Sequence, residues 1–207
     1  VDRLEQFPQW NNKPSVKVAE GDLVYPDWFA GMWEVTSTPI EQIAPLAPKI
    51  VTPGFENNRN YLNKPVHFQV KFAENYSPKQ TKLLTSSAIA GKLPIIADRA
   101  FNGLKIAQSY LGDDGVISVK IDTENFNKQI TLLKGGDRLV ATVTGKKRKK
   151  PAQNRFVSTE ITQQLFRNRS RVYLNEVETT TTYQLLESRK IEANQVTAIY
   201  LSPQDPD

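Results

Sequence analysis

The sequence predicts a mainly β fold: a single antiparallel, up-and-down β-barrel with an N-terminal arm and one packed helix. Three observations support this prediction. Short segments of alternating apolar and polar residues recur along the chain, turn residues separate them at hairpin spacing, and only one segment has helical periodicity. Closed up-and-down barrels give every strand a partner, and 207 residues are enough for one such domain.

The first 26 residues show no regular pattern and are expected to lie over the domain as an arm. Three prolines and two adjacent asparagines interrupt this stretch. The barrel domain is predicted to span residues 27–207. It begins with a single helical turn at Asp27, after which Gly31 lets the chain turn sharply into a strand over 31–38.

Alternation predicts most of the later strands. The clearest strand covers 66–72, where every second residue is Val or Phe and the residues between them are polar. Further strands are expected in segments of similar pattern, namely 82–90, 115–123, 128–133, 138–145, 155–165, 172–186 and 196–201. The two glycines within 134–137 predict a hairpin, and the basic, polar stretch 167–171 predicts another turn.

One helix is predicted over about 98–111. Asp98 is a suitable N-cap, and Gly112 suits the position just after a helix. Four apolar residues between them recur at i, i+4, i+7 and i+11, which places them on one helical face. We expect this face to pack against the sheet.

The composition excludes several kinds of site. The chain has no Cys, which excludes thiol nucleophiles, disulfides and Cys-based metal sites, and its one His, His67, excludes metal sites that need a His pair. His67 alternates with the apolar residues of its strand and is expected to face solvent. No metal site and no cofactor are predicted. No apolar run approaches the roughly 18 residues of a membrane-spanning helix.

The positive charge of the chain is concentrated in one run. Lys and Arg number 27 against 22 Asp and Glu, a net charge of +5, and Lys146, Lys147, Arg148, Lys149 and Lys150 by themselves carry five positive charges. We interpret this run as part of a hairpin loop. It lacks interleaved aromatic residues, so nucleic acid is the least favoured partner. A solvated loop, or contact with an anionic membrane surface or acidic partner, remains open.

Acidic residues on one strand are the best candidates for chemistry. Glu176 and Glu178 lie two apart and share a strand face, where they have the spacing to hold a cation, to share a proton, or to pair with Lys or Arg on a neighbouring strand. With Tyr183 they are the first suspects for an enzyme. Because the chain has no Cys and one solvent-facing His, a non-enzymatic function is favoured and no catalytic residue is assigned.

The tripeptide Gly31-Met32-Trp33, with Trp28 before it and a strand after it, resembles the Gly-x-Trp opening of lipocalin-like (calycin) barrels. In those folds the Trp closes one end of the barrel beneath an Arg near the end of the last strand. The resemblance implies a lipocalin-like barrel in which Gly31, Trp33 and Trp28 are barrel-closing residues. The predicted strand 196–201 contains no Arg, so Arg189 or Arg171 is expected to take that place.

A second resemblance covers nearly all of the chain. Five segments are similar to an uncharacterised family of cyanobacteria and plastids: 25–28, 44–55, 98–102, 175–180 and 195–206. Because members usually carry an N-terminal export or transit segment, the resemblance implies a photosynthetic source and a location in the thylakoid lumen or periplasm, where the chain is soluble once that segment is removed. A chain that begins without Met fits such processing. The resemblance implies no activity.

Two functional hypotheses follow. The first is a non-enzymatic carrier that holds a small hydrophobic ligand, such as a lipid, a carotenoid or a tetrapyrrole-like molecule, inside the barrel. Its ligand-binding residues are expected to be Phe68, Val70, Phe72, Thr181 and Tyr183. The alternative is an assembly or interaction factor that docks to photosynthetic membranes or complexes through Lys146–Lys150 and the apolar loop 44–55.

Overall fold

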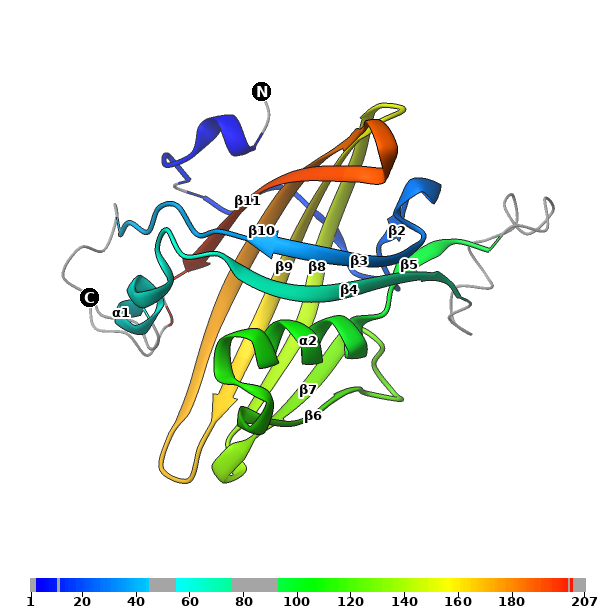
Figure 1. The fold of residues 1–207 in the computed structure, drawn as a ribbon. Coiled ribbons are helices and arrows are strands. Elements are labelled where there is room, and N and C mark those ends of the chain that lie inside the picture. The colour runs from blue at the N-terminus through cyan, green and yellow to red at the C-terminus, as the bar shows by residue number, and fades with distance from the viewer. Residues whose placement is uncertain (1–2, 11, 45–54, 76–92, 201, 203–207) are drawn as a thin grey trace.

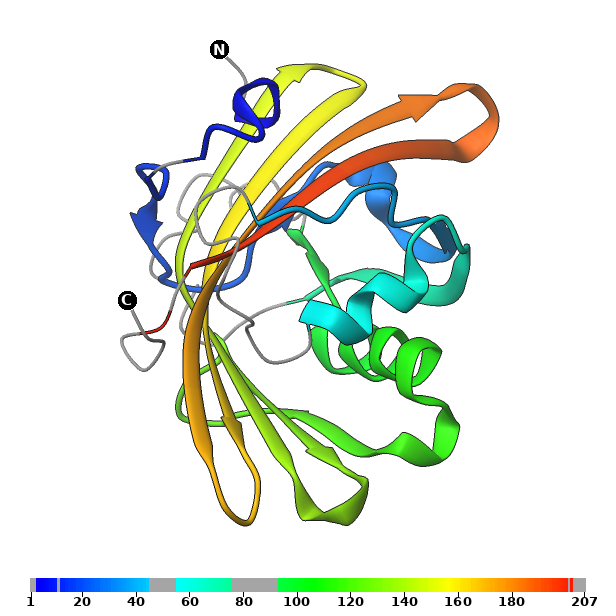
Figure 2. The ribbon, with the colours of Figure 1, turned by 90° about the vertical axis from the view of Figure 1, so that its left-hand side faces the viewer.

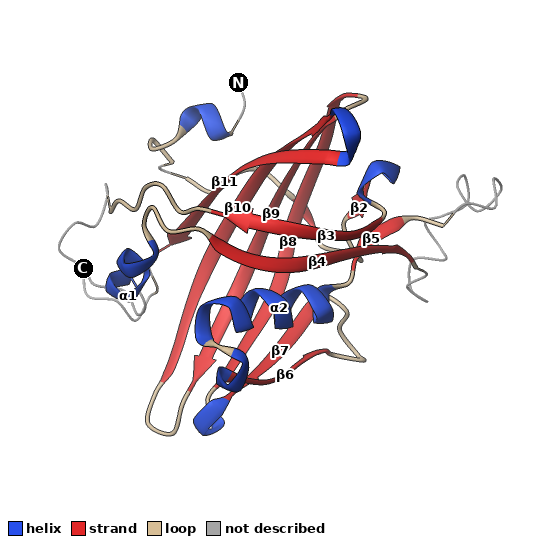
Figure 3. Cartoon of the chain, in the orientation of Figure 1, coloured by secondary structure: helices blue, strands red, loops and turns tan. Residues whose placement is uncertain are grey.

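The computed structural model describes residues 3–10, 12–44, 55–75, 93–200 and 202, which form a mainly β, antiparallel fold, as predicted (Figures 1 and 3). The predicted strand over 82–90 and most of the predicted loop over 44–55 lie outside the described residues. Within the described ranges, no helix combines the length and the apolar character needed to cross a bilayer.

The larger of two sheets has the strand order β11-β10-β9-β8-β7-β6, with β1 paired to β8. Its strands are β1 (Lys17–Val18), β6 (Val116–Ile121), β7 (Lys128–Leu133), β8 (Arg138–Ala152), β9 (Arg155–Arg167), β10 (Val172–Leu186) and β11 (Lys190–Tyr200). From β6 onward each strand pairs with its neighbour in sequence, as expected for an up-and-down sheet. The long strands curve, so the sheet has a concave and an outer face (Figure 2).

The smaller sheet has the order β2-β5-β4-β3 and crosses the concave side of the larger one (Figures 1 and 2). It contains β2 (Val24–Tyr25), β3 (Gly31–Ser37), β4 (Val66–Glu74) and β5 (Ile95–Ala97), and the short helix α1 (Phe55–Asn58) precedes β4. Among the described residues no strand pairing joins the two sheets. They therefore face each other without closing into a hydrogen-bonded ring.

The predicted helix is confirmed as α2 (Arg99–Leu111). The Asp98 carboxylate accepts a hydrogen bond from the backbone N–H of Phe101 at 3.1 Å, and Gly112 ends the helix with a φ of 79°. The buried Asn102 holds the helix to β4, because its Oδ1 accepts from the Lys71 N–H at 2.6 Å and its Nδ2 donates to the Lys71 carbonyl at 3.1 Å. The helix also contacts β6, so it spans from one sheet to the other.

An aromatic core packs the two sheets together. Phe29 and Phe156 are each only 2% exposed. The Phe29 ring lies 4.9 Å from Phe72 of β4 and 5.0 Å from Tyr183 of β10, so a single side chain contacts both sheets. Tyr25 adds edge-on contacts to Phe29 and Phe72, each with ring centroids 4.8 Å apart.

Strand β8 is longer than the sequence predicts. The hairpin loop predicted over Lys146–Lys150 is wrong, because Lys146–Lys149 pair with residues 157–160 of β9 and the turn lies at Gln153–Asn154. Backbone pairing with β9 thus carries β8 through the basic run, past the apolar stretch that ends at Val143.

The N-terminal segment contributes to both sheets. The predicted arm, residues 1–26, includes β1 and β2, whereas the part before β1 lies on the outer face of the larger sheet (Figure 2). The strands β1, β2 and β5 are two or three residues long and carry no periodic pattern that sequence reasoning could detect. Strand β11 begins at Lys190, well before the predicted 196.

Candidate functional site

The small sheet presents an apolar wall to the concave side of the large sheet. Phe72 belongs to the aromatic core, and by strand alternation Phe68 and Val70 share its face. Trp33 and Val35 of β3 pair with Val70 and Phe68, respectively, and continue the wall. All four of these further residues are half-buried, so each keeps part of its surface accessible.

The opposing wall on the large sheet is mostly polar. Tyr183 pairs with Phe156 in the core, and the next two inward positions of β10 are Thr181 and Thr179. Thr181 is buried and donates its hydroxyl to Oε1 of Gln195 at 3.1 Å. Thr179 is half-buried. This polar side of β10 therefore faces the small sheet.

Charged residues extend this polar wall. Lys146 of β8 pairs with Glu160 of β9, which in turn pairs with Thr179. The Lys146 Nζ is buried and has no hydrogen-bond partner among the residues that the structure describes. Burial lowers the pKa of Lys146, with Glu160 and Asp22 acting in the opposite direction. Burial raises the pKa of Glu160, an effect that Arg99 and Lys146 oppose. The wall thus contains an ammonium and a carboxyl group with little solvation.

The five predicted ligand-binding residues all lie on inward faces but do not form one lining. Phe72 and Tyr183 pack in the aromatic core, so they fill space at that end. Phe68 and Val70 continue the apolar wall away from the core, and Thr181 lies on the opposite wall. The structure adds Lys146, Glu160, Trp33 and Val35 to this set.

The predicted barrel-closing residues gather at one end of the two sheets. Trp33 donates its indole N–H to the Phe29 carbonyl at 2.7 Å, and Trp28 stacks on the Phe29 ring with centroids 4.3 Å apart. The Arg189 guanidinium lies 5.8 Å from the centre of the Trp33 ring. The Arg189 Nη2 atom is 3.5 Å from the position that a Cβ on residue 31 would occupy, and Gly31 has a φ of 117°. Of the two arginines expected above Trp33, Arg189 is the one found there.

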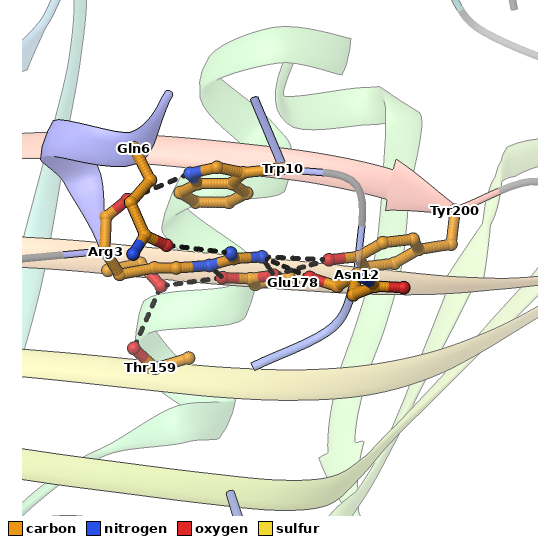
Figure 4. A network of polar contacts seen from close by, with 8 residues as sticks. Arg3, Gln6, Trp10, Asn12, Thr159, Glu178 and Tyr200 are labelled. Carbon is orange, nitrogen blue, oxygen red and sulfur yellow. Dashed lines mark hydrogen bonds and ion pairs between the residues drawn. The ribbon is translucent and has the colours of Figure 1, made fainter. Parts of the chain in front are cut away.

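On the outer face, β10 and β11 anchor the N-terminal segment (Figure 4). Glu178 is fully buried and accepts hydrogen bonds from Nε and Nη2 of Arg3 at 2.9 and 2.8 Å and from the Tyr200 hydroxyl at 2.6 Å. The Trp10 indole donates to the Arg3 carbonyl, and the Arg3 guanidinium lies 4.2 Å from the centre of that ring. Glu178 therefore holds the segment in place.

The residues suspected of catalysis do not form one site. Glu176 and Glu178 share the outer face, as predicted, and Glu176 forms an ion pair with Lys13. Tyr183 points to the opposite face of β10 and lies in the core. His67 is exposed, as expected, and its Nδ1 lies 3.0 Å from the Thr36 hydroxyl. In the described part of the chain, no three acidic or histidine side chains gather as metal ligands.

A cleft of about 720 Å³ lies between the N-terminal segment and the β8–β9 hairpin. Its floor includes Val157 and Thr159, which are on the outer face of β9. Six basic residues and one acidic residue, Glu5, are among those that line it; the basic ones are Arg3, Lys147, Arg148, Lys149, Lys150 and Arg155. Four of the five residues predicted to dock a membrane or partner thus line one cleft, whereas Lys146 faces the concave side. Of these four, Arg148 also belongs to the concave face by strand alternation, and its guanidinium donates to the Val24 carbonyl at 2.6 Å.

Sequence reasoning missed the charged part of the inner wall and the role of Arg3. Lys146 was grouped with its neighbours because the register shift between Val143 and Gly145, which decides its face, leaves no mark in the sequence. The sequence does contain one signal for Glu160. It is the only charged residue in the strand segment Phe156–Ile161, whose other residues are apolar or carry a hydroxyl group. Arg3 has no such signal.

Comparison with known proteins identifies one related family. The model of the family described as "Domain of unknown function (DUF6816)" matches residues 17–207. Neither the curated proteins nor the solved structures contain a match.

Proposed function

The chain belongs to the DUF6816 family, and we propose that it is a non-enzymatic carrier that holds a small, largely hydrophobic ligand between its two sheets. The observation that supports this proposal most strongly is the pair of facing walls. The inward residues Trp33, Val35, Phe68 and Val70 on one side and Glu160 and Thr179 on the other keep accessible surface, although they point toward the interior of the fold. Binding sites of this kind combine apolar walls with a few convergent polar groups.

The walls suggest an amphiphilic ligand. Its apolar body would lie along Phe68 and Val70, and its polar end would meet the Lys146 and Glu160 pair. A buried ammonium without a partner is costly, and a ligand oxygen that accepts its hydrogen bond would relieve this cost. Lipids, carotenoids with oxygen substituents and tetrapyrrole-like molecules all have this division of polarity.

The same proposal includes an open lipocalin-like barrel. Gly31, Trp33 and Arg189 support it, because an arginine lies over the tryptophan of a Gly-x-Trp segment at one end of the sheets. The aromatic core would close that end, and α2 would cover the side between β4 and β6. We further propose, from the resemblance to cyanobacterial and plastid proteins, that the carrier works in the thylakoid lumen or periplasm.

Native mass spectrometry of protein purified from a photosynthetic host tests the proposal. A bound mass that disappears on denaturation is the expected result. Val70→Trp, which fills the inner wall, should abolish the bound mass, whereas Gln69→Trp places the same ring on the opposite face of β4 and should leave it unchanged. A ligand-free protein from the same host, or equal binding by both variants, would overturn the carrier function.

A further inference from the structure

We propose that the cleft between the N-terminal segment and the β8–β9 hairpin is a docking site for the headgroups of an anionic membrane surface. This basic cleft, lined by Arg3, Lys147, Lys149, Lys150 and Arg155, lies on the outer face of the large sheet. It is separate from the walls of the proposed carrier site, which are on the concave face. The inference therefore does not depend on the carrier function.

The charge of the cleft is the first argument. Six basic residues and one acidic residue line it, but Arg3 is neutralised by Glu178 and Arg148 donates to the Val24 carbonyl on the concave side. The remaining four, Lys147, Lys149, Lys150 and Arg155, still outnumber the single acidic residue, so an anion meets a net positive potential there. Three lysines outside the cleft form ion pairs: Lys13 with Glu176, Lys71 with Asp98 and Lys128 with Asp122. By contrast, the exposed side chains of Lys147, Lys149 and Lys150 form no hydrogen bond or ion pair with any other described residue.

The backbone supplies the second argument. Because Lys147 and Lys149 belong to a paired strand, their Cα atoms are fixed roughly 7 Å apart on one face. The opposite wall is held by the bond between Arg3 and the buried Glu178. The cations that would bind a lipid headgroup are therefore held in position before binding. Less conformational entropy is lost on binding than if the same residues lay on a mobile loop.

The composition of the lining favours lipid over nucleic acid. No aromatic side chain is among the described residues that line the cleft, so bases have no ring to stack on there. The cleft opens beside the β8–β9 turn, which lies at one end of the molecule (Figure 1). A flat bilayer surface can reach such an end without contacting the rest of the sheet.

Vesicle co-sedimentation with the full chain tests this docking site. Vesicles of phosphatidylglycerol and phosphatidylcholine should bind the protein at low salt, and binding should fall steeply with added salt. The double variant Lys147→Gln/Lys149→Gln should bind roughly 30-fold more weakly, because each lysine near an anionic surface contributes about a 5-fold gain. The matched variant Lys120→Gln/Lys134→Gln has the same charge but changes exposed lysines outside the cleft, and it should bind like the wild type.

Three results would overturn the proposal. They are equal binding to vesicles of pure phosphatidylcholine, equal losses in the two double variants, and tighter binding to a single-stranded oligonucleotide than to the anionic vesicles. A fourth arm adds inorganic phosphate at constant ionic strength. Release of the protein by phosphate would show that the cleft prefers a free anion to a membrane, which also contradicts docking.

Discussion

The Arg3 guanidinium binds both carboxylate oxygens of Glu178, a residue 175 positions further along the chain, at 2.9 and 2.8 Å. The carboxylate is fully buried, whereas the Arg3 side chain keeps 17% of its surface exposed. The hydrogen bonds to Glu178 raise the pKa of Arg3 above its usual value. The N-terminal segment therefore supplies the counter-charge of a carboxylate inside the large sheet.

Arg3→Ala should lower the free energy of unfolding by about 3 kcal/mol, because it leaves Glu178 as a buried charge without its counter-ion. Urea denaturation at pH 7 measures this change. The double variant Arg3→Ala/Glu178→Gln should lose less than the sum of the two single variants, since it removes both charges together. Additive losses would contradict the proposed coupling.

Tyr200 should make the protein sensitive to alkaline pH. Burial, together with the hydrogen bond to Glu178, raises the pKa of Tyr200. The unfolded chain loses the phenol proton near pH 10, while the folded protein keeps it. The stability contribution is fully present below about pH 10 and is lost as the pH rises toward the folded pKa. The urea midpoint should fall more steeply above about pH 10 for the wild type than for Tyr200→Phe. Parallel pH profiles would contradict this prediction.

Asn102→Ala should destabilise the fold by about 2 kcal/mol, because it leaves the Lys71 N–H without its acceptor and removes one donor from the Lys71 carbonyl. Asn102→Asp keeps the acceptor but loses the donor, and should be intermediate. Thermal and urea unfolding measure both changes. Lys105→Ala, a change in the same helix outside this contact, is the control.

Lys146→Met should stabilise the ligand-free protein by about 1 kcal/mol, because it removes a buried ammonium that has no hydrogen-bond partner. Burial lowers the pKa of Lys146, so the protonated form is disfavoured in the folded state. The gain should therefore shrink as the pH approaches the usual lysine pKa. Lys147→Met changes the exposed neighbour and should alter stability by less than about 0.5 kcal/mol. A destabilised Lys146→Met would contradict the burial argument.

Local patterns predicted the elements whose causes are local. Helix α2 was found because its cap, its apolar spacing and its terminal glycine all lie within the helix and its two flanking residues, and β10 was found with its observed bounds, Val172–Leu186. The split of β10 into an outer face with Glu178 and an inner face with Tyr183 followed from alternation. The crossing of the two sheets did not follow, because it depends on contacts such as Phe29 with Phe72 and Tyr183 that are distant in sequence.

The candidate site was harder to predict because one irregularity controls it. Between Val143 and Gly145 the register of β8 against β9 shifts by one residue. A shift of this kind exchanges the two faces of every later residue, so Lys146 turns inward and Lys147 outward. Alternation counted from Val143 alone would give the reverse assignment. The separation of one basic run into an inner ammonium and an outer cleft thus rests on backbone geometry.

The attachment of α2 to β4 also bears on how the protein behaves at high concentration. An uncovered strand edge offers a row of backbone donors and acceptors to which a strand from another molecule can add. The Asn102 side-chain amide bonds the Lys71 N–H and carbonyl much as a neighbouring strand would. It thus occupies backbone groups to which a strand from another molecule could otherwise bind. Within the described residues, strand β5 pairs with β4 only at Phe72–Glu74, so the helix covers β4 at Lys71, where that strand partner ends, in addition to joining the two sheets.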